Sequence, residues 1–128
     1  MALRVVRLGA PREPSEGLRI GTVRRPPRGV PREEFARRDY YDVWLPELAP
    51  STELVAVAQD AHTDSAWGAF VRAYRKEMSR PEARHLLLLL AALSQTSNLS
   101  VGCYCEDENR CHRGVLQELL EQAGADLA

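Results

Sequence analysis

The side chains best suited to chemistry are gathered in one short segment near the end of the chain. The sequence contains three cysteines, Cys103, Cys105 and Cys111, and all of them lie within nine residues. Cys111 is followed directly by His112 and Arg113. Thiolates act as nucleophiles and metal ligands, whereas imidazole and guanidinium groups donate hydrogen bonds to anions. Three kinds of site are therefore compatible with this segment, and a fourth interpretation assigns it no function.

The first interpretation is a site for a small anion. The segment precedes a stretch with helical periodicity, and the free N–H groups at a helix N-terminus attract phosphate or carboxylate. Arg113 and these N–H groups would hold the anion, while His112 would donate a hydrogen bond or transfer a proton. Arg110 could complete the site, as could Arg24, Arg25 or Arg28 from the Arg- and Pro-rich loop at 24–29. Of these, Arg28 is expected to close over it.

The second interpretation is thiol chemistry. A cysteine at a helix N-terminus beside cationic groups has a lowered pKa, which makes Cys111 the candidate nucleophile. Cys105 would contact the ligand and could resolve Cys111 as a disulfide. The five-residue spacing between cysteine and arginine in a phosphatase loop is absent, because four residues separate Cys105 from Arg110 and six separate Cys103 from it.

The third interpretation is a metal site, because three thiolates and one imidazole make a complete tetrahedral set for zinc. Against it, Cys111 and His112 are adjacent, and neighbouring side chains on a helix diverge by about 100°. The C-x-C and C-H spacing also differs from the usual pair of C-x-x-C motifs. The fourth interpretation treats Cys103 and Cys105 as small apolar residues on a buried strand, with Cys111 packed under the last helix.

Hydrophobic periodicity predicts the elements that position this segment. Short β-like runs cover residues 3–8, 18–23 and 99–105, whereas residues 51–59 fit either a helix or a strand, with Ser51 as a helix cap. A short helix is expected at 31–38. Three longer helices are expected, and they begin at Thr63-Asp64, at a capping box over residues 79–82, and at Arg113. The last of them ends at Gly124. The apolar face of the first consists of Trp67, Phe70, Val71, Tyr74 and Met78.

This order of elements predicts an α/β protein formed as one compact domain over residues 1–128, with a small, mostly parallel sheet covered by helices in Rossmann-like layers. The helix through residues 86–93 is apolar on nearly all sides and is expected to be central and buried. Ligands of such folds bind beyond the carboxyl ends of the strands, which again indicates residues 103–113.

The charge distribution offers a rival function. The net charge is −1, but residues 1–39 carry ten arginines against five acidic residues, and the remainder is acidic. A basic first third could bind nucleic acid or a protein partner without catalysis. Alternatively, it neutralises the acidic remainder within one domain.

Several classes of protein are excluded by composition. The longest apolar run, residues 86–93, is far shorter than the roughly 20 residues of a membrane-spanning helix, and no secretory leader is visible, so we expect a cytoplasmic protein. No Gly-rich phosphate loop or dinucleotide fingerprint occurs, and no cofactor is predicted. The other histidines, His62 and His85, are expected to be structural or solvated.

Four blocks of the sequence carry a resemblance to a known family. They are Arg19-Ile20 through Pro27-Arg28-Gly29-Val30, residues 44–54 with Leu48-Ala49-Pro50-Ser51, the set Trp67, Phe70, Tyr74 and Glu77, and Cys105 through Cys111-His112-Arg113. In this order they resemble the domain-of-unknown-function 488 family of small bacterial proteins over nearly the whole chain. Family members usually carry Asp-Arg-Leu-Trp where this chain has Val23-Arg24-Arg25-Pro26, so the chain resembles a divergent member.

The resemblance implies a single α/β domain whose Cys-His-Arg segment opens the last helix, and it implies no reaction. From the residues we expect a protein that binds a small anionic ligand, such as a nucleotide or phosphorylated metabolite, at the start of that helix. Whether the protein is an enzyme is left open by the sequence.

Overall fold

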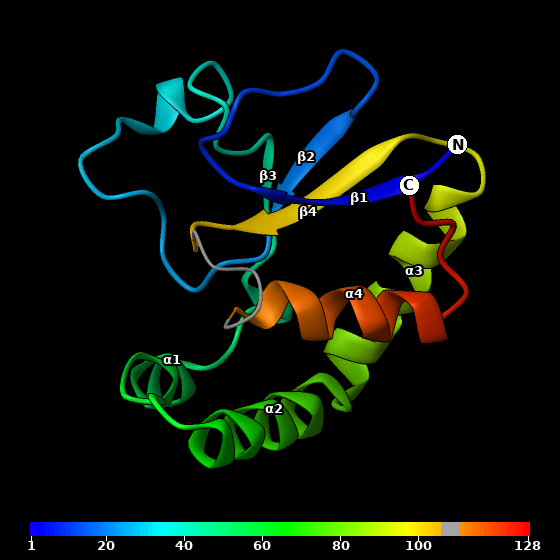
Figure 1. The fold of residues 1–128 in the computed structure, drawn as a ribbon. Coiled ribbons are helices and arrows are strands. Elements are labelled where there is room, and N and C mark those ends of the chain that lie inside the picture. Colours follow the sequence, from blue (N-terminus) through cyan, green and yellow to red (C-terminus); the bar gives the residue numbers. More distant parts are fainter. Residues whose placement is uncertain (106–110) are drawn as a thin grey trace.

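The computed structural model describes residues 1–105 and 111–128 and shows a four-stranded sheet in which every strand is parallel to its neighbours (Figure 1). The strand order is β1-β4-β2-β3, so β4 lies between β1 and β2. The carboxyl ends of all four strands therefore meet at one edge of the sheet. Together with the helices, the sheet confirms the predicted α/β fold. The strands are β1 (Leu3–Arg7), β2 (Leu18–Gly21), β3 (Val43–Trp44) and β4 (Leu99–Cys103).

The helices gather on one side of the sheet, below it in Figure 1. Their apolar faces and the sheet enclose the main core, in which Val101 of the central strand and Leu116 of the last helix are fully buried. Within the described residues, none of the helices has the length and apolar character needed to cross a bilayer. The helices are α1 (Thr52–Gln59), α2 (Asp64–Met78), α3 (Pro81–Ser94) and α4 (His112–Gln122), with 3-10 turns η1 (Arg32–Glu34) and η2 (Pro46–Leu48).

Side-chain caps settle the helix boundaries that the sequence left open. The Ser51 side chain accepts a hydrogen bond from the Leu54 N–H, which makes residues 52–59 a helix rather than a strand. Thr63 caps α2 in the same way by accepting from the Ala66 N–H. At the other end of the chain, Gly124 follows α4 with a φ of 97°, as expected of a helix stop. The helix expected at 31–38 is shorter, because only η1 forms there.

Two expectations for α3 are wrong. The capping box does not form, because the Ser79 hydroxyl donates to the Lys76 carbonyl oxygen and the N-cap residue is Arg80, which makes no side-chain cap. The helix is also not buried on all sides: Leu88 and Leu89 are each about half exposed. It packs on the core through one face only, that of Leu87 and Leu90.

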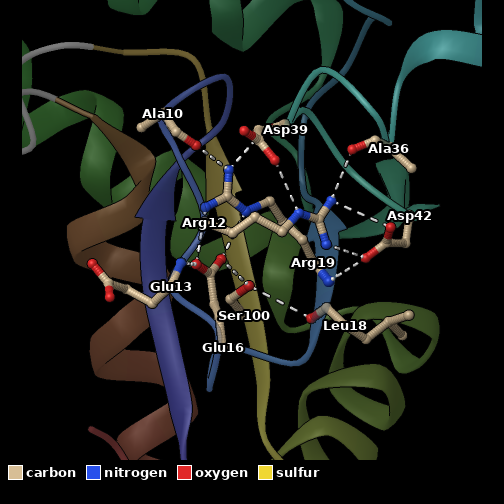
Figure 2. Close-up of polar contacts among 10 residues, drawn as sticks. All are labelled: Ala10, Arg12, Glu13, Glu16, Leu18, Arg19, Ala36, Asp39, Asp42 and Ser100. Carbon is tan, nitrogen blue, oxygen red and sulfur yellow. Dashed lines mark hydrogen bonds and ion pairs between the residues drawn. The ribbon is translucent and has the colours of Figure 1, made fainter.

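The face of the sheet opposite the helices is covered by irregular segments that an internal ion-pair network fastens in place (Figure 2). The Arg19 guanidinium, 1% exposed, donates from Nε and Nη2 to the two carboxylate oxygens of Glu16 at 2.7 and 3.0 Å. Its Nη1 donates to the carbonyl oxygens of Ala10 and Asp39. Arg12 pairs with the side chains of Asp39 and Asp42.

This network gives part of the basic first third of the chain a structural role. The Arg12 and Arg19 side chains are bonded within the fold, and Arg24 donates to three backbone carbonyl oxygens, those of Pro46, Ala49 and Pro50. These three arginines therefore bond to groups of the protein itself, although within the described part of the chain only their Arg12–Asp42 pair joins the basic first third to an acidic residue of the remainder.

Candidate functional site

The chain brings its three cysteines together at the carboxyl edge of the sheet. Cys103 is the last residue of the central strand β4, Cys105 follows two residues later, and Cys111 is the N-cap of α4. The Cys103 and Cys111 side chains are buried, whereas Cys105 is exposed. All three cysteines line the same cavity. The site therefore lies where ligands of parallel α/β sheets usually bind.

Cys111 does not have the helical backbone that the sequence argument against a metal site assumed. Its φ and ψ are −132° and 148°, which is extended, so its side chain is not rotated by one helical step from that of His112. Cys111 Sγ lies 3.9 Å from His112 Nδ1. The sulfurs of Cys103 and Cys111 and a ring nitrogen of His112 all lie within 4.8 Å of one another. The adjacency of Cys111 and His112 is therefore no obstacle to shared binding.

The His112 ring is held in one orientation by its buried surroundings. Its Nε2 lies 2.7 Å from the carbonyl oxygen of Thr22, and because a carbonyl oxygen only accepts, Nε2 must carry the proton. The edge of the ring meets the Tyr74 ring at a centroid distance of 5.5 Å. Burial lowers the pKa of His112, which favours the neutral ring. Nδ1 then presents a lone pair toward Cys111.

The three thiols have different acidities. Interactions with Cys103 and then with Cys111 lower the pKa of Cys105, and the positive charge of Arg113 adds to this effect. The pKa of Cys103 is raised by its hydrogen bonds to Cys105 and Cys111 and by burial. For Cys111 a hydrogen bond from Cys103 lowers the pKa, but the bond to Cys105 and burial outweigh it and raise the value to about 11. This direction is opposite to the one that the sequence predicted for Cys111.

Arg113 is part of the wall behind the cluster rather than a solvated side chain. It is 6% exposed, and its Nη2 donates to the carbonyl oxygen of Cys105 at 2.8 Å. Its buried Nε has no hydrogen-bond partner among the described residues. The first turn of α4 contains no acidic residue, and Cys111 provides no side-chain cap. The positive partial charge at the N-terminus of α4 is thus not offset by a side chain of its first turn.

A cavity of about 580 Å³ lies against the cluster. Its wall is largely apolar, and it includes Trp67 and Phe70, whose rings stack with centroids 4.6 Å apart. Cys103, Cys105, Cys111 and His112 form one part of this wall. The other lining residues are Val23, Arg24, Arg25, Pro50, Thr52, Val55, Ala56, Ala58, Gln59 and Tyr104.

The arginines that the sequence placed near the anion differ in position. Arg25 lines the cavity and is exposed, and its carbonyl oxygen accepts a hydrogen bond from the Tyr104 hydroxyl. Arg24 also lines it, although its guanidinium is bonded to backbone carbonyl oxygens. Arg28 is exposed and is not among the lining residues, and Arg110 lies outside the described residues.

Sequence reasoning did not identify the apolar part of the site. Trp67 and Phe70 were expected only as core residues of α2, and the residues of α1 had no assigned element. The cap at Ser51 was the available signal, because it fixes α1 and thereby one wall of the cavity.

Comparisons with known proteins bear on this site. A family model described as the "Active DUF488-N3 subclade" matches residues 3–124, which include every described residue of the site. Comparisons with curated proteins and with solved structures found no significant match.

Proposed function

The chain belongs to the DUF488 family, and from this premise we propose that it binds a small anionic molecule in the cavity at the start of α4. The observation that carries the proposal is one of position. A ligand-sized cavity, an electropositive helix N-terminus and a cluster of reactive side chains meet at the carboxyl edge of a parallel sheet.

The cavity favours a ligand with a planar, apolar part. Its volume of about 580 Å³ is within the usual range for small-molecule sites. Trp67, whose ring is backed by the buried ring of Phe70, and Tyr104 are aromatic side chains of the wall on which a planar group could stack. A nucleobase fits this description better than a small metabolite without a ring.

The start of α4 favours a negative charge on the same ligand. Positive partial charge at the helix N-terminus is not offset by an acidic residue in the first turn. Arg113 lies behind this turn with its Nε unpartnered among the described residues, and Arg25 lies at the cavity wall. Together these observations support a nucleotide-type ligand, as we expected from the sequence. The roles expected of Arg28 and Arg110 remain predictions.

The name of the matching subclade, "active", favours an enzyme over a binding module. Cys105 is the thiol that we propose would meet a ligand, because it is the exposed member of the cluster and lines the cavity. Cys111, which the sequence favoured as nucleophile, also lines the cavity but is buried. We propose that Cys111 and His112 support the site from the wall.

The proposal is tested by measuring ligand binding by calorimetry with matched probes. Nucleoside 5′-monophosphates are compared with the corresponding nucleosides and with inorganic phosphate, all with reduced protein. We expect a monophosphate to bind at least tenfold more tightly than either part alone, since it satisfies both regions of the site. Equal or absent binding of all three probes would contradict the proposal, and strongly salt-dependent binding of RNA or DNA instead would favour the rival function.

A further inference from the structure

We propose that Cys103, Cys111 and His112 bind a divalent transition-metal ion of the zinc class. All three side chains are buried, and their two sulfurs and one nitrogen lie within 4.8 Å of one another. Thiolate sulfur and imidazole nitrogen are the ligands that Zn²⁺ prefers in proteins. Within residues 1–105 and 111–128, no other group of three cysteine, histidine or acidic side chains comes this close together.

The distances suit a single tetrahedral ion. With Zn–S bonds of about 2.3 Å and Zn–N bonds of about 2.0 Å, two ligand atoms on one ion lie roughly 3.5–3.8 Å apart. Cys111 Sγ and His112 Nδ1 are already 3.9 Å apart. This pair is therefore close to the tetrahedral spacing, and every pair among the three ligand atoms lies within about 1.3 Å of it, since none is more than 4.8 Å from another.

The surroundings of His112 match those of a metal-binding histidine. Such histidines usually donate their second ring N–H to a carbonyl or carboxylate oxygen, which fixes the ring and the tautomer. Here Nε2 donates to the Thr22 carbonyl oxygen, and Nδ1 faces the sulfur of Cys111. When the ion binds, Cys103 and Cys111 each release their thiol proton, and the neutral ring contributes its lone pair.

Cys105 is a candidate fourth ligand of the same ion. Its thiol is exposed and lines the same cavity, and it lies outside the group of three ligand atoms within 4.8 Å of one another. A site with Cys105 as fourth ligand would be closed and structural, whereas a site without it would keep a position for a ligand in the cavity. The number of thiolates on the metal distinguishes these two forms.

This inference goes beyond the proposed ligand binding and does not depend on it, because the metal is tested alone. Reduced protein, freed of metal, is titrated with Co²⁺, which reports tetrahedral thiolate binding through its visible d–d bands and near-ultraviolet charge-transfer absorption. We expect one ion per chain and displacement of Co²⁺ by Zn²⁺, which binds N and S sites more tightly. The nucleotide screen is then repeated on both metal-free and zinc-loaded protein, so failure of either proposal is seen separately.

Variants identify the ligands. Affinity for Co²⁺ should fall more than about a hundredfold in His112→Asn and in the double variant Cys103→Ser/Cys111→Ser, since losing a ligand costs more than losing an outer-sphere partner. His85→Asn is the matched control, because His85 is exposed on α3 and should leave binding unchanged. In Cys105→Ser, the charge-transfer absorption should fall by about a third if Cys105 is the fourth ligand, and should persist in full if the site is open.

The result that overturns the proposal does not require any variant to fold. It is the absence of tetrahedral cobalt bands from reduced wild-type protein. The same conclusion follows if His112→Asn, shown to be folded by circular dichroism, binds Co²⁺ as tightly as the wild type.

Discussion

His112 donates from Nε2 to the carbonyl oxygen of Thr22 at 2.7 Å, which joins the first residue of α4 to the residue that follows β2. Thr22 is fully buried, and both its N–H and its hydroxyl donate to the Gly102 carbonyl oxygen, at the end of β4. One buried residue thus links the ends of two neighbouring strands to the start of the helix. The candidate site is built on these connections rather than on mobile surface groups.

Replacing His112 by alanine should destabilise the protein for this reason. The substitution removes the donor to a buried carbonyl oxygen, and an unsatisfied buried acceptor costs about 1–3 kcal/mol of the free energy of unfolding. The cost is measured by urea denaturation of metal-free protein. His62→Ala is the control, because His62 is exposed and should change the stability by less than about 0.5 kcal/mol. Equal stabilities of the two variants would show that the His112–Thr22 bond contributes nothing.

The ion pair between Glu16 and Arg19 should make stability depend on pH in the acid range. Burial raises the pKa of the Glu16 carboxyl, but the hydrogen bonds from Arg19, Ser100 and the Glu13 N–H outweigh it and lower the pKa below 4.5. A folded-state pKa below the unfolded value contributes stability above the unfolded pKa, and this contribution is lost as the pH falls toward the folded value. The midpoint of thermal unfolding should therefore drop below about pH 4.5.

Glu16→Gln should remove much of this pH dependence and lower stability at pH 7 by about 3–5 kcal/mol, because it leaves the Arg19 charge buried without its partner. Thermal unfolding between pH 3 and 7 measures both effects. Glu13→Gln is the matched control, because Glu13 is exposed and bonds to Glu16 through its backbone N–H and carbonyl groups, which the substitution keeps. An unchanged pH profile in Glu16→Gln would show that other carboxylates, such as Asp42, whose pKa is also lowered, account for the acid sensitivity.

Local signals in the sequence predicted most of the fold. The cap at Thr63, the apolar face of α2 and the stop at Gly124 all depend on contacts within a few residues, and the structure confirms each. The burial of α3 could not be predicted in the same way. A helix that is apolar all round shows no preferred face, so the side that meets the core is decided by partners distant in the sequence.

The site shows the same division between local and tertiary information. The clustering of Cys103, Cys105 and Cys111 was visible in the sequence, as was its place between a strand and the last helix. The buried environment that raises the pKa of Cys111 was not visible, because it comes from neighbours in three dimensions. The extended backbone of Cys111 was equally hidden. It removes the argument that Cys111 and His112, as neighbours on a helix, would point apart and could not share a metal ion.

Two leucines of α3 test which face of the helix packs. Leu90 is buried in the main core, and Leu90→Ala should cost about 2–5 kcal/mol of the free energy of unfolding. Leu89, its neighbour, is 53% exposed, so Leu89→Ala should change the stability by less than about 0.5 kcal/mol. Urea denaturation measures both values. A cost above 2 kcal/mol for Leu89→Ala would mean that this face is covered in solution.

The cavity beside the cysteine cluster can be narrowed without disturbing the core. Ala56 lies on α1, lines the cavity and is exposed. The indole side chain in Ala56→Trp can therefore be accommodated and should occupy space that a ligand needs. We expect the affinity of the best nucleoside monophosphate to fall at least tenfold, while the stability stays within about 1 kcal/mol of the wild type. Binding is measured by calorimetry and stability by urea denaturation.

Val57 provides the matched control, because it is the next residue of α1, is exposed and is not among the cavity-lining residues. Val57→Trp introduces the same side chain on the same helix and should leave the affinity unchanged. Equal losses of affinity in the two variants would indicate a general effect of tryptophan on α1. If Ala56→Trp bound the monophosphate as tightly as the wild type, the ligand would have to bind outside this cavity. An anion bound at the start of α4 would then have to reach it by a route other than the cavity.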